Sequence, residues 1–148
     1  MAQVNVMKAK PIDLTSHLER YGLKHCPIDN SINILGKKYA LHIIRNMVLL
    51  KQSRFNQFLK SIEGINTKTL SIRLKEMERF GLISRRILSR RPIEVEYSLT
   101  DKGKALEPLL GFLADYSMKF EPKIIFPDKK PRNIRQVFGT EILSKVYD

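Results

Sequence analysis

The sequence predicts a mainly α-helical fold with one small β-hairpin wing, an α+β architecture. Leu70, Leu74 and Met77 recur at i, i+4 and i+7, the spacing of one apolar face of an α-helix. Directly after them, residues 82–88 and 93–99 read as two strands, because apolar and polar side chains alternate along the second. A helix, a short glycine-containing turn, a second helix and a hairpin together predict a winged helix-turn-helix.

Upstream of this stretch, apolar spacing predicts four helices. Gly22 and Gly36 end the first two, and Pro27 starts the second, since proline is favoured at the first helical position. The third is apolar nearly all round, which predicts a central buried helix. Ser53 is expected to cap the fourth. The four helices are expected at residues 13–21, 27–35, 39–50 and 54–62, after ten residues without periodicity.

Downstream of the hairpin, Thr100 is expected to cap one long helix, which Pro108 should kink early on. The apolar stripe of this helix is wider than packing on the wing requires. We therefore expect terminal helices to form a dimer interface, with packing on the same domain as the alternative. The predicted interface residues are Leu106, Leu109, Leu110, Leu113, Tyr116 and Phe120.

The last segment changes in composition, since residues 121–133 contain three prolines and are predicted to be a linker. An amphipathic C-terminal helix should follow, weakened by Gly139. Its apolar residues are Ile134, Val137, Phe138, Ile142 and Val146. The predicted organisation is an extension with a short helix at 1–25, a winged helix-turn-helix domain with its dimerisation helix at 26–120, and the linker with the C-terminal helix at 121–148.

The chain is strongly basic. It has 27 Lys and Arg residues against 15 Asp and Glu, a formal net charge of +12 and a pI near 10.0. Residues 65–91 alone hold eight basic residues and two acids, half of that net charge. Such a balance favours a polyanionic partner, namely double-stranded DNA. A membrane surface is the rival partner, but it would favour a basic amphipathic helix with large apolar residues opposite, and the chain has no tryptophan.

Other classes of function find little support. No apolar run approaches the roughly 20 residues of a membrane span, and residues 1–10 lack the apolar core of a signal peptide. A single cysteine cannot form an internal disulfide, so we expect a cytoplasmic protein. One cysteine and three scattered histidines give no metal-ligand spacing. His25 and Cys26 are neighbours, but no orienting third group accompanies them, so we expect no enzyme activity and no cofactor. The sequence identifies no effector ligand.

The predicted DNA-binding residues lie on the outer face of the helix and on the hairpin. Projected at 100° per residue, Lys68, Ile72 and Lys75 fall opposite the apolar stripe, with Ser71 at the margin. Hydroxyl and apolar groups at this face suit base edges, which a purely electrostatic binder does not need. This favours a sequence-specific regulator over the alternative, a non-specific architectural protein that coats DNA. The full set is Asn66, Thr67, Lys68, Ser71, Ile72, Lys75, Arg79, Arg86, Arg90 and Arg91.

A series of short segments follows the order of a known family. They are Cys26-Pro27, residues 35–39, Ile44-Arg45, residues 54–56, 64–70, 73–78, 81–83 and 95–100, and Gly103. In these segments the chain resembles the HxlR-type winged helix transcription regulators, relatives of the MarR group. The resemblance implies a homodimer joined by terminal helices that binds paired operator half-sites, with the wing over the DNA backbone or minor groove. Two departures are Tyr39 in place of the family's usual tryptophan, and a more basic wing tip.

Cys26 is a candidate redox sensor. Pro27 at the first helical position makes Cys26 the N-cap, where free amide groups and the helix dipole stabilise a thiolate. Lys24 and His25 add positive charge beside it. The resemblance implies the same role, since the cysteine of the leading Cys-Pro pair is a thiol sensor in some family members. The alternative is that Cys26 is a small buried hydrophobic residue.

Overall fold

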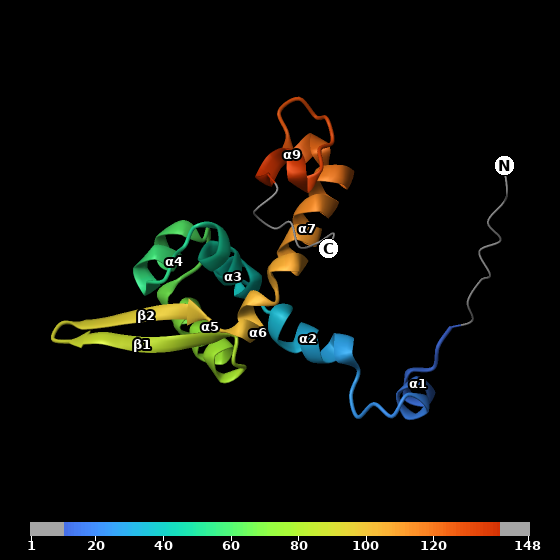
Figure 1. The fold of residues 1–148 in the computed structure, drawn as a ribbon, viewed down its shortest axis with the longest axis horizontal. Coiled ribbons are helices and arrows are strands. Elements are labelled where there is room, and N and C mark those ends of the chain that lie inside the picture. The colour runs from blue at the N-terminus through green and yellow to red at the C-terminus, as the bar shows by residue number, and fades with distance from the viewer. Residues whose placement is uncertain (1–10, 140–148) are drawn as a thin grey trace. The chain divides into compact units, whose positions relative to one another are not determined.

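The computed structural model describes residues 11–139 and divides the chain into two compact units, Met1–Gly36 and Lys37–Asp148 (Figure 1). The domain boundaries expected after residues 25 and 120 stay predictions. Among the described residues, no helix is both long and apolar enough to cross a membrane.

The first unit contains the two helices that the sequence predicts, α1 (Leu14–Arg20) and α2 (Pro27–Leu35). Asp13 caps α1, because its carboxylate accepts hydrogen bonds from the backbone N–H and the hydroxyl of Ser16, and these bonds lower the pKa of Asp13. Pro27 occupies the start of α2, and Cys26 is its N-cap residue. The predicted helix starts are therefore confirmed.

The second unit begins with three helices, α3 (Ala40–Leu49), α4 (Phe55–Ser61) and α5 (Thr67–Arg79). The prediction that the third helix is central is confirmed, because Ala40, Ile43 and Ile44 are wholly buried. These side chains share the core with Phe58, Leu70, Leu74 and Met77.

The prediction that Ser53 caps α4 with its own side chain is wrong. Arg54 is the N-cap residue, and the Gln57 side chain reaches back to this point. Gln57 Oε1 accepts hydrogen bonds from the backbone N–H groups of Ser53 and Arg54, at 2.9 and 3.0 Å. The amide side chain of Gln57, about one helical turn later in the sequence, therefore takes the capping role that was expected of the Ser53 hydroxyl.

The hairpin consists of β1 (Ile83–Arg90) and β2 (Ile93–Leu99), paired antiparallel. Arg86 lies opposite Glu96. The four-residue turn expected at residues 89–92 is wrong, because Arg90 pairs with Ile93 and leaves only Arg91 and Pro92 at the tip. Pairing continues past an irregularity in register between Ile87 and Ser89.

Two helices follow the hairpin where one was expected, α6 (Asp101–Lys104) and α7 (Glu107–Phe120). Thr100 does cap the first, since its hydroxyl accepts a hydrogen bond from the Gly103 N–H. The helical backbone is interrupted at residues 105–106. Pro108 lies in the first turn of α7, where its missing N–H leaves no helical hydrogen bond unformed. Pro108 therefore starts a new helix instead of kinking an existing one. Gly103 is required here, since a Cβ would lie 2.1 Å from the Leu82 carbonyl oxygen.

The segment predicted as a linker contains α8 (Pro122–Ile125) and leads to α9 (Ile134–Phe138). Both short helices pack on α7. Ile134 is almost wholly buried, and its backbone N–H donates to Asp115 Oδ1 at 3.1 Å. Helix α9 ends at Phe138, and its C-cap residue Gly139 has a φ of +75°. Ile142 and Val146, expected on the same helix, lie outside the described residues.

Candidate nucleic-acid interface

Helix α5 presents two chemically different faces. Leu70, Leu74 and Met77 are buried, as predicted. The opposite face is exposed and carries Lys68, Ile72, Lys75 and Arg79, with Ser71 half-buried at its margin. Ile72 is 44% exposed although its side chain is wholly apolar. An exposed β-branched side chain among cations is available for contact with a partner.

The start of α5 is fixed by a turn and a cap. Gly64 has a φ of +79°, which a glycine adopts without strain, and the turn joins α4 to α5. Asn66 Oδ1 accepts a hydrogen bond from the Thr69 N–H at 2.8 Å, so this oxygen is already used. Asn66 therefore serves α5 as its N-cap, and its amide nitrogen is the group left to bind a partner.

A charged cluster holds α5 against the start of α3. Glu76 forms ion pairs with Lys37 at 3.0 Å and with Arg73 at 2.6 Å. The Arg73 Nε donates to the Lys38 carbonyl oxygen at 2.9 Å. The hydrogen bond from Lys37, followed by those from Arg73, lowers the pKa of Glu76. Arg73 and Lys37 are thus occupied within the domain, unlike the cations on the outer face of α5.

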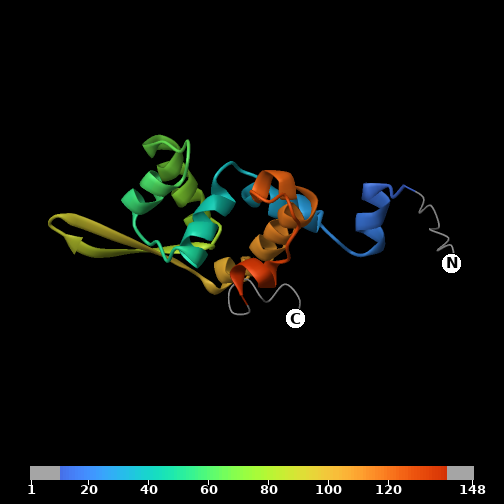
Figure 2. The same cartoon turned by 90° about the horizontal axis from the view of Figure 1, so that it is seen from above.

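The hairpin projects from the helices of its unit (Figure 1). Near its tip, β1 ends at Arg90, and Arg91 follows in the turn. Figure 2 shows the same projection from above. Arg86 Nη2 forms an ion pair with Glu96 Oε1 at 2.9 Å, although the Arg86 side chain stays 72% exposed. Part of its charge is therefore neutralised within the wing. Arg90 and Arg91 are exposed, and neither forms an ion pair with any described residue.

The structure brings the ten predicted DNA-binding residues into two groups. One group lies on α5 and its cap, and the other on the hairpin that follows. Among these ten residues, the cations that form no ion pair with a described residue are Lys68, Lys75, Arg79, Arg90 and Arg91. The N-cap role of Asn66 and the Arg86–Glu96 pair were weakly visible in the sequence, since a cap and a cross-strand partner are local features.

Sequence reasoning missed Asn46, a wholly buried polar residue on α3. Its Nδ2 donates to Gln52 Oε1 at 3.0 Å and to Ser61 Oγ at 2.9 Å. Its Oδ1 accepts from Arg45 Nε at 2.9 Å. This network ties α3 to both ends of the segment that contains α4. A polar residue in a mainly apolar helix was the only signal available, and it does not reveal partners so distant in the sequence.

The predicted dimer stripe on α7 divides in two. Leu110 is buried within its own unit, and Leu106 and Leu109 are half-buried. Leu113, Tyr116 and Phe120 are 43%, 55% and 61% exposed, and Phe112, which the stripe did not include, is 59% exposed. The rings of Tyr116 and Phe120 lie 5.1 Å apart between centroids. The outer part of the stripe is therefore a continuous apolar surface.

Cys26 is half-buried at the start of α2. Its side chain makes no capping hydrogen bond. It lines a cavity of about 380 Å³ together with Leu14, Leu18, Lys24, His25, Asp29, Asn30 and Asn33. Cys26 therefore borders a space that a small reagent can enter, and Lys24 and His25 border the same space.

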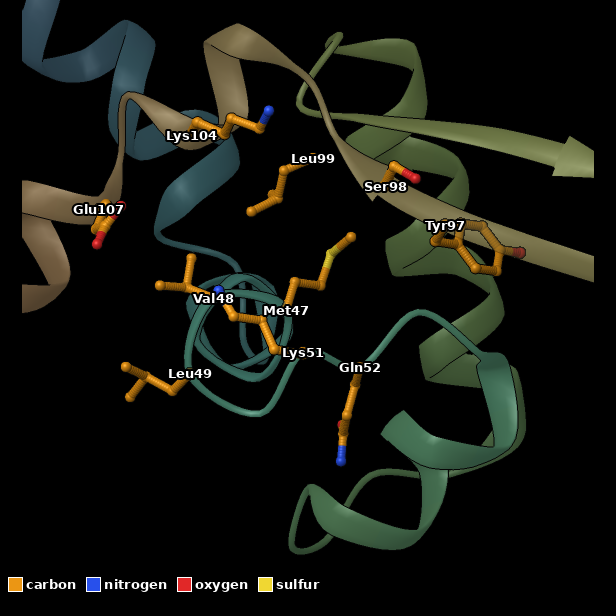
Figure 3. Close-up of a pocket in the computed structure, with 10 residues that line it drawn as sticks. All are labelled: Met47, Val48, Leu49, Lys51, Gln52, Tyr97, Ser98, Leu99, Lys104 and Glu107. Atoms are coloured by element: carbon orange, nitrogen blue, oxygen red, sulfur yellow. The ribbon is translucent and has the colours of Figure 1, made fainter. Parts of the chain in front are cut away.

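A second cavity, of about 540 Å³, lies between the end of α3, the end of β2 and the α6–α7 junction (Figure 3). Met47, Val48 and Leu99 supply apolar side chains, and Lys104 and Glu107 supply charge. Among the described residues, no group of three or more His, Cys, Asp or Glu is placed to hold a metal ion.

Comparison with known sequences identifies relatives. A sequence model of the HxlR-like helix-turn-helix family matches residues 34–124. YdeP of Bacillus subtilis (strain 168), described as an uncharacterized HTH-type transcriptional regulator, is 34% identical over 99 residues, which cover 67% of this chain and 77% of YdeP. The regulator sll1512 of Synechocystis, described in the same words, is 34% identical over 110 residues, which cover 74% of this chain and 73% of that protein.

Solved structures agree with this result. A MarR-family transcriptional regulator from Porphyromonas gingivalis W83 matches with a TM-score of 0.59 and 31% identity, covering 66% of this chain and 94% of that one. The reduced form of YodB from B. subtilis matches with a TM-score of 0.55 and 33% identity, covering 65% and 94%. The redox regulator HypR in its oxidized form matches with a TM-score of 0.57 and 29% identity, covering 62% and 94%. With its helix-turn-helix and its hairpin wing, the chain belongs to the HxlR-like helix-turn-helix family of transcription regulators.

Proposed function

We propose that this regulator binds specific operator sequences as a homodimer. In this proposal the outer face of α5 enters the major groove, and the wing-tip arginines bind the backbone or the minor groove. The protein would act in the cytoplasm, and the proposal assigns it no catalytic activity and no cofactor.

The observation that carries the proposal is the exposed face of α5. Lys68, Lys75 and Arg79 stand free of ion pairs with described residues, whereas Arg73 on the same helix is bound by Glu76. Lys75 and Arg79, together with the arginines at the wing tip, supply the phosphate contacts that dominate DNA affinity, and Lys68 is assigned to a base edge. Ser71 and Ile72 lie among them and offer a hydroxyl and an apolar group to base edges.

The alternative is an architectural protein that binds DNA through charge alone. Footprinting of the purified protein on the DNA upstream of its own gene, with random duplex as competitor, separates the two. A bounded footprint that survives an excess of random DNA supports the specific regulator. Protection that spreads along the whole fragment and disappears with random competitor would establish the architectural role instead.

Dimerisation is supported by the apolar surface on α7. Leu113, Tyr116 and Phe120 are exposed on one helix, and a second copy of the same helix would bury them. The α5 helices of the two subunits would then bind half-sites about 34–36 Å apart, or a multiple of that spacing. The footprint should accordingly show two protected half-sites related by a two-fold axis.

We also propose that Cys26 makes the regulator responsive to thiol oxidants. HypR is described as a redox regulator, and YodB is known in a reduced and a diamide-treated form. Cys26 is half-buried and faces a cavity bordered by Lys24 and His25. With one cysteine in the chain, oxidation by diamide joins its sulfur to a second thiol, from another subunit or from a small thiol such as glutathione, while diamide is reduced to the hydrazine.

Diamide treatment is therefore expected to change operator affinity by about tenfold in the wild type and to leave Cys26→Ser unaffected. The added bond brings bulk to the start of α2, which Cys26 caps. Affinity is measured with and without diamide, in the presence of glutathione, and mass spectrometry records the adduct. Equal responses of the two proteins would retire Cys26 as the sensor.

A further inference from the structure

One edge of β2 is covered by the residues that begin α4. Ser53 accepts a hydrogen bond from the Tyr97 N–H through its carbonyl oxygen, at 2.8 Å. Beside it, Arg54 Nη1 donates to the Val95 carbonyl oxygen at 3.3 Å. Val95 and Tyr97 are two residues apart, so their backbone groups point to the same edge of the strand, away from β1. Neighbouring groups on the free edge of the wing are thus both bound by the same short segment.

The segment that makes these hydrogen bonds is itself held rigid. Gln57 Oε1 accepts from the N–H groups of both Ser53 and Arg54. The ring of Phe58, wholly buried on α4, meets the ring of Tyr97 edge-on, with centroids 6.4 Å apart. Arg54 is half-buried, so its guanidinium is confined between α4 and the strand. These interactions therefore hold β2 in a defined position relative to α4.

The wing needs such support because a two-stranded hairpin is marginally stable by itself. Within residues 11–139, the Arg54–Val95 bond is the hydrogen bond between hairpin and helices that lies nearest the wing tip. Beyond Val95 the strands extend to Arg90 and Arg91 without a further hydrogen bond to a described helix. This bond therefore joins the start of α4 to the part of the wing nearest its tip.

We propose that Arg54 is a positioning residue for DNA binding. Its guanidinium fixes the angle of the wing so that α5 and the wing-tip arginines reach the same duplex together. It acts through the wing and binds no phosphate of its own. This inference rests on the proposed DNA-binding function.

A double-mutant cycle tests the proposal. Arg54→Met should lower operator affinity by roughly tenfold in the wild type, but by less than about threefold when Arg90 and Arg91 are both alanine, because the wing tip then no longer binds DNA. Arg54→Lys should fall between, since an ammonium group keeps the charge and can donate to one carbonyl. Lys60→Met is the matched control on the same helix, and its effect should be equal in both backgrounds. An equal effect of Arg54→Met in both backgrounds would overturn the positioning role.

Hydrogen exchange of the free protein gives a second readout. In Arg54→Met the Tyr97 amide should exchange at least tenfold faster, while the amides that pair β1 with β2 keep their protection. Unchanged Tyr97 exchange would overturn the proposal as well. If the wild type itself binds no operator, the proposed function fails, but the exchange measurement still decides whether Arg54 holds the wing.

Discussion

Replacing Leu113 and Phe120 with glutamate is expected to convert the regulator into a monomer and to weaken operator binding by about 10²–10⁴-fold. Both side chains are exposed on α7, and two charges at a closed apolar seam would each lose water without gaining a partner. The affinity falls because each half-site would then be bound separately. Sedimentation at micromolar concentration and operator titration measure the two effects.

The matched control is Ile124→Glu. Ile124 is 77% exposed on α8, outside the predicted stripe, so the same change in charge should leave the dimer intact. The dimer proposal would be contradicted by a wild-type monomer that still protects two half-sites. It would be contradicted equally by a double glutamate variant that sediments as a dimer.

Substitutions on α5 and on the wing are expected to act in two different ways. Alanine at Lys68, Ser71 or Ile72 should change the preference among operators by about 1–3 kcal/mol for each base that the side chain no longer reads. Glutamine at Lys75 or Arg91 should weaken binding to all sequences alike and reduce the salt dependence by about one unit for each phosphate no longer neutralised. The difference arises because base edges carry sequence information and phosphates do not.

These effects are measured by titrating each variant against the operator, a single-base variant of it and random duplex, at several salt concentrations. Arg73→Gln is a useful comparison, since Arg73 lies on the same helix but is bound to Glu76 and to the Lys38 carbonyl. Its effect should appear in thermal stability and not in sequence preference. If every α5 substitution lowers specific and random binding by the same factor, the protein is architectural and not sequence-specific.

Several elements of the fold could be predicted from the sequence because their causes lie within a few residues. Pro27 at the start of α2, the Thr100 cap and the buried stripe of α5 depend on local backbone geometry and on helical periodicity. The partner of Arg86 was not fixed in this way, because strands at residues 82–88 and 93–99 would place Arg86 opposite Val95. The two-residue tip and the irregular register bring Glu96 opposite Arg86 instead. The exposed outer face of α5 follows from the same periodicity.

Other features depended on packing between residues far apart in the chain. In α6 the backbone of Gly103 packs on the Leu82 carbonyl, an interaction that periodicity in residues 100–120 does not contain. The proline-containing segment after residue 120 folds on α7 because Ile134 finds a buried place there. Composition predicted a linker at residues 121–133, and the short helix α8 lies within this segment and packs on α7.

The sequence by itself determined the family, the helix that carries the candidate DNA-binding face and the basic residues on it. Only the tertiary structure decided which of the basic residues are free. Glu76 binds Lys37 and the Lys38 carbonyl accepts from Arg73, although each pair is far apart in the sequence. Arg54 is turned to Val95, whereas Lys75 stays free of ion pairs with described residues. Residue type fixes a side chain's charge, but its partner is set by which distant acid or carbonyl the fold brings within about 3 Å.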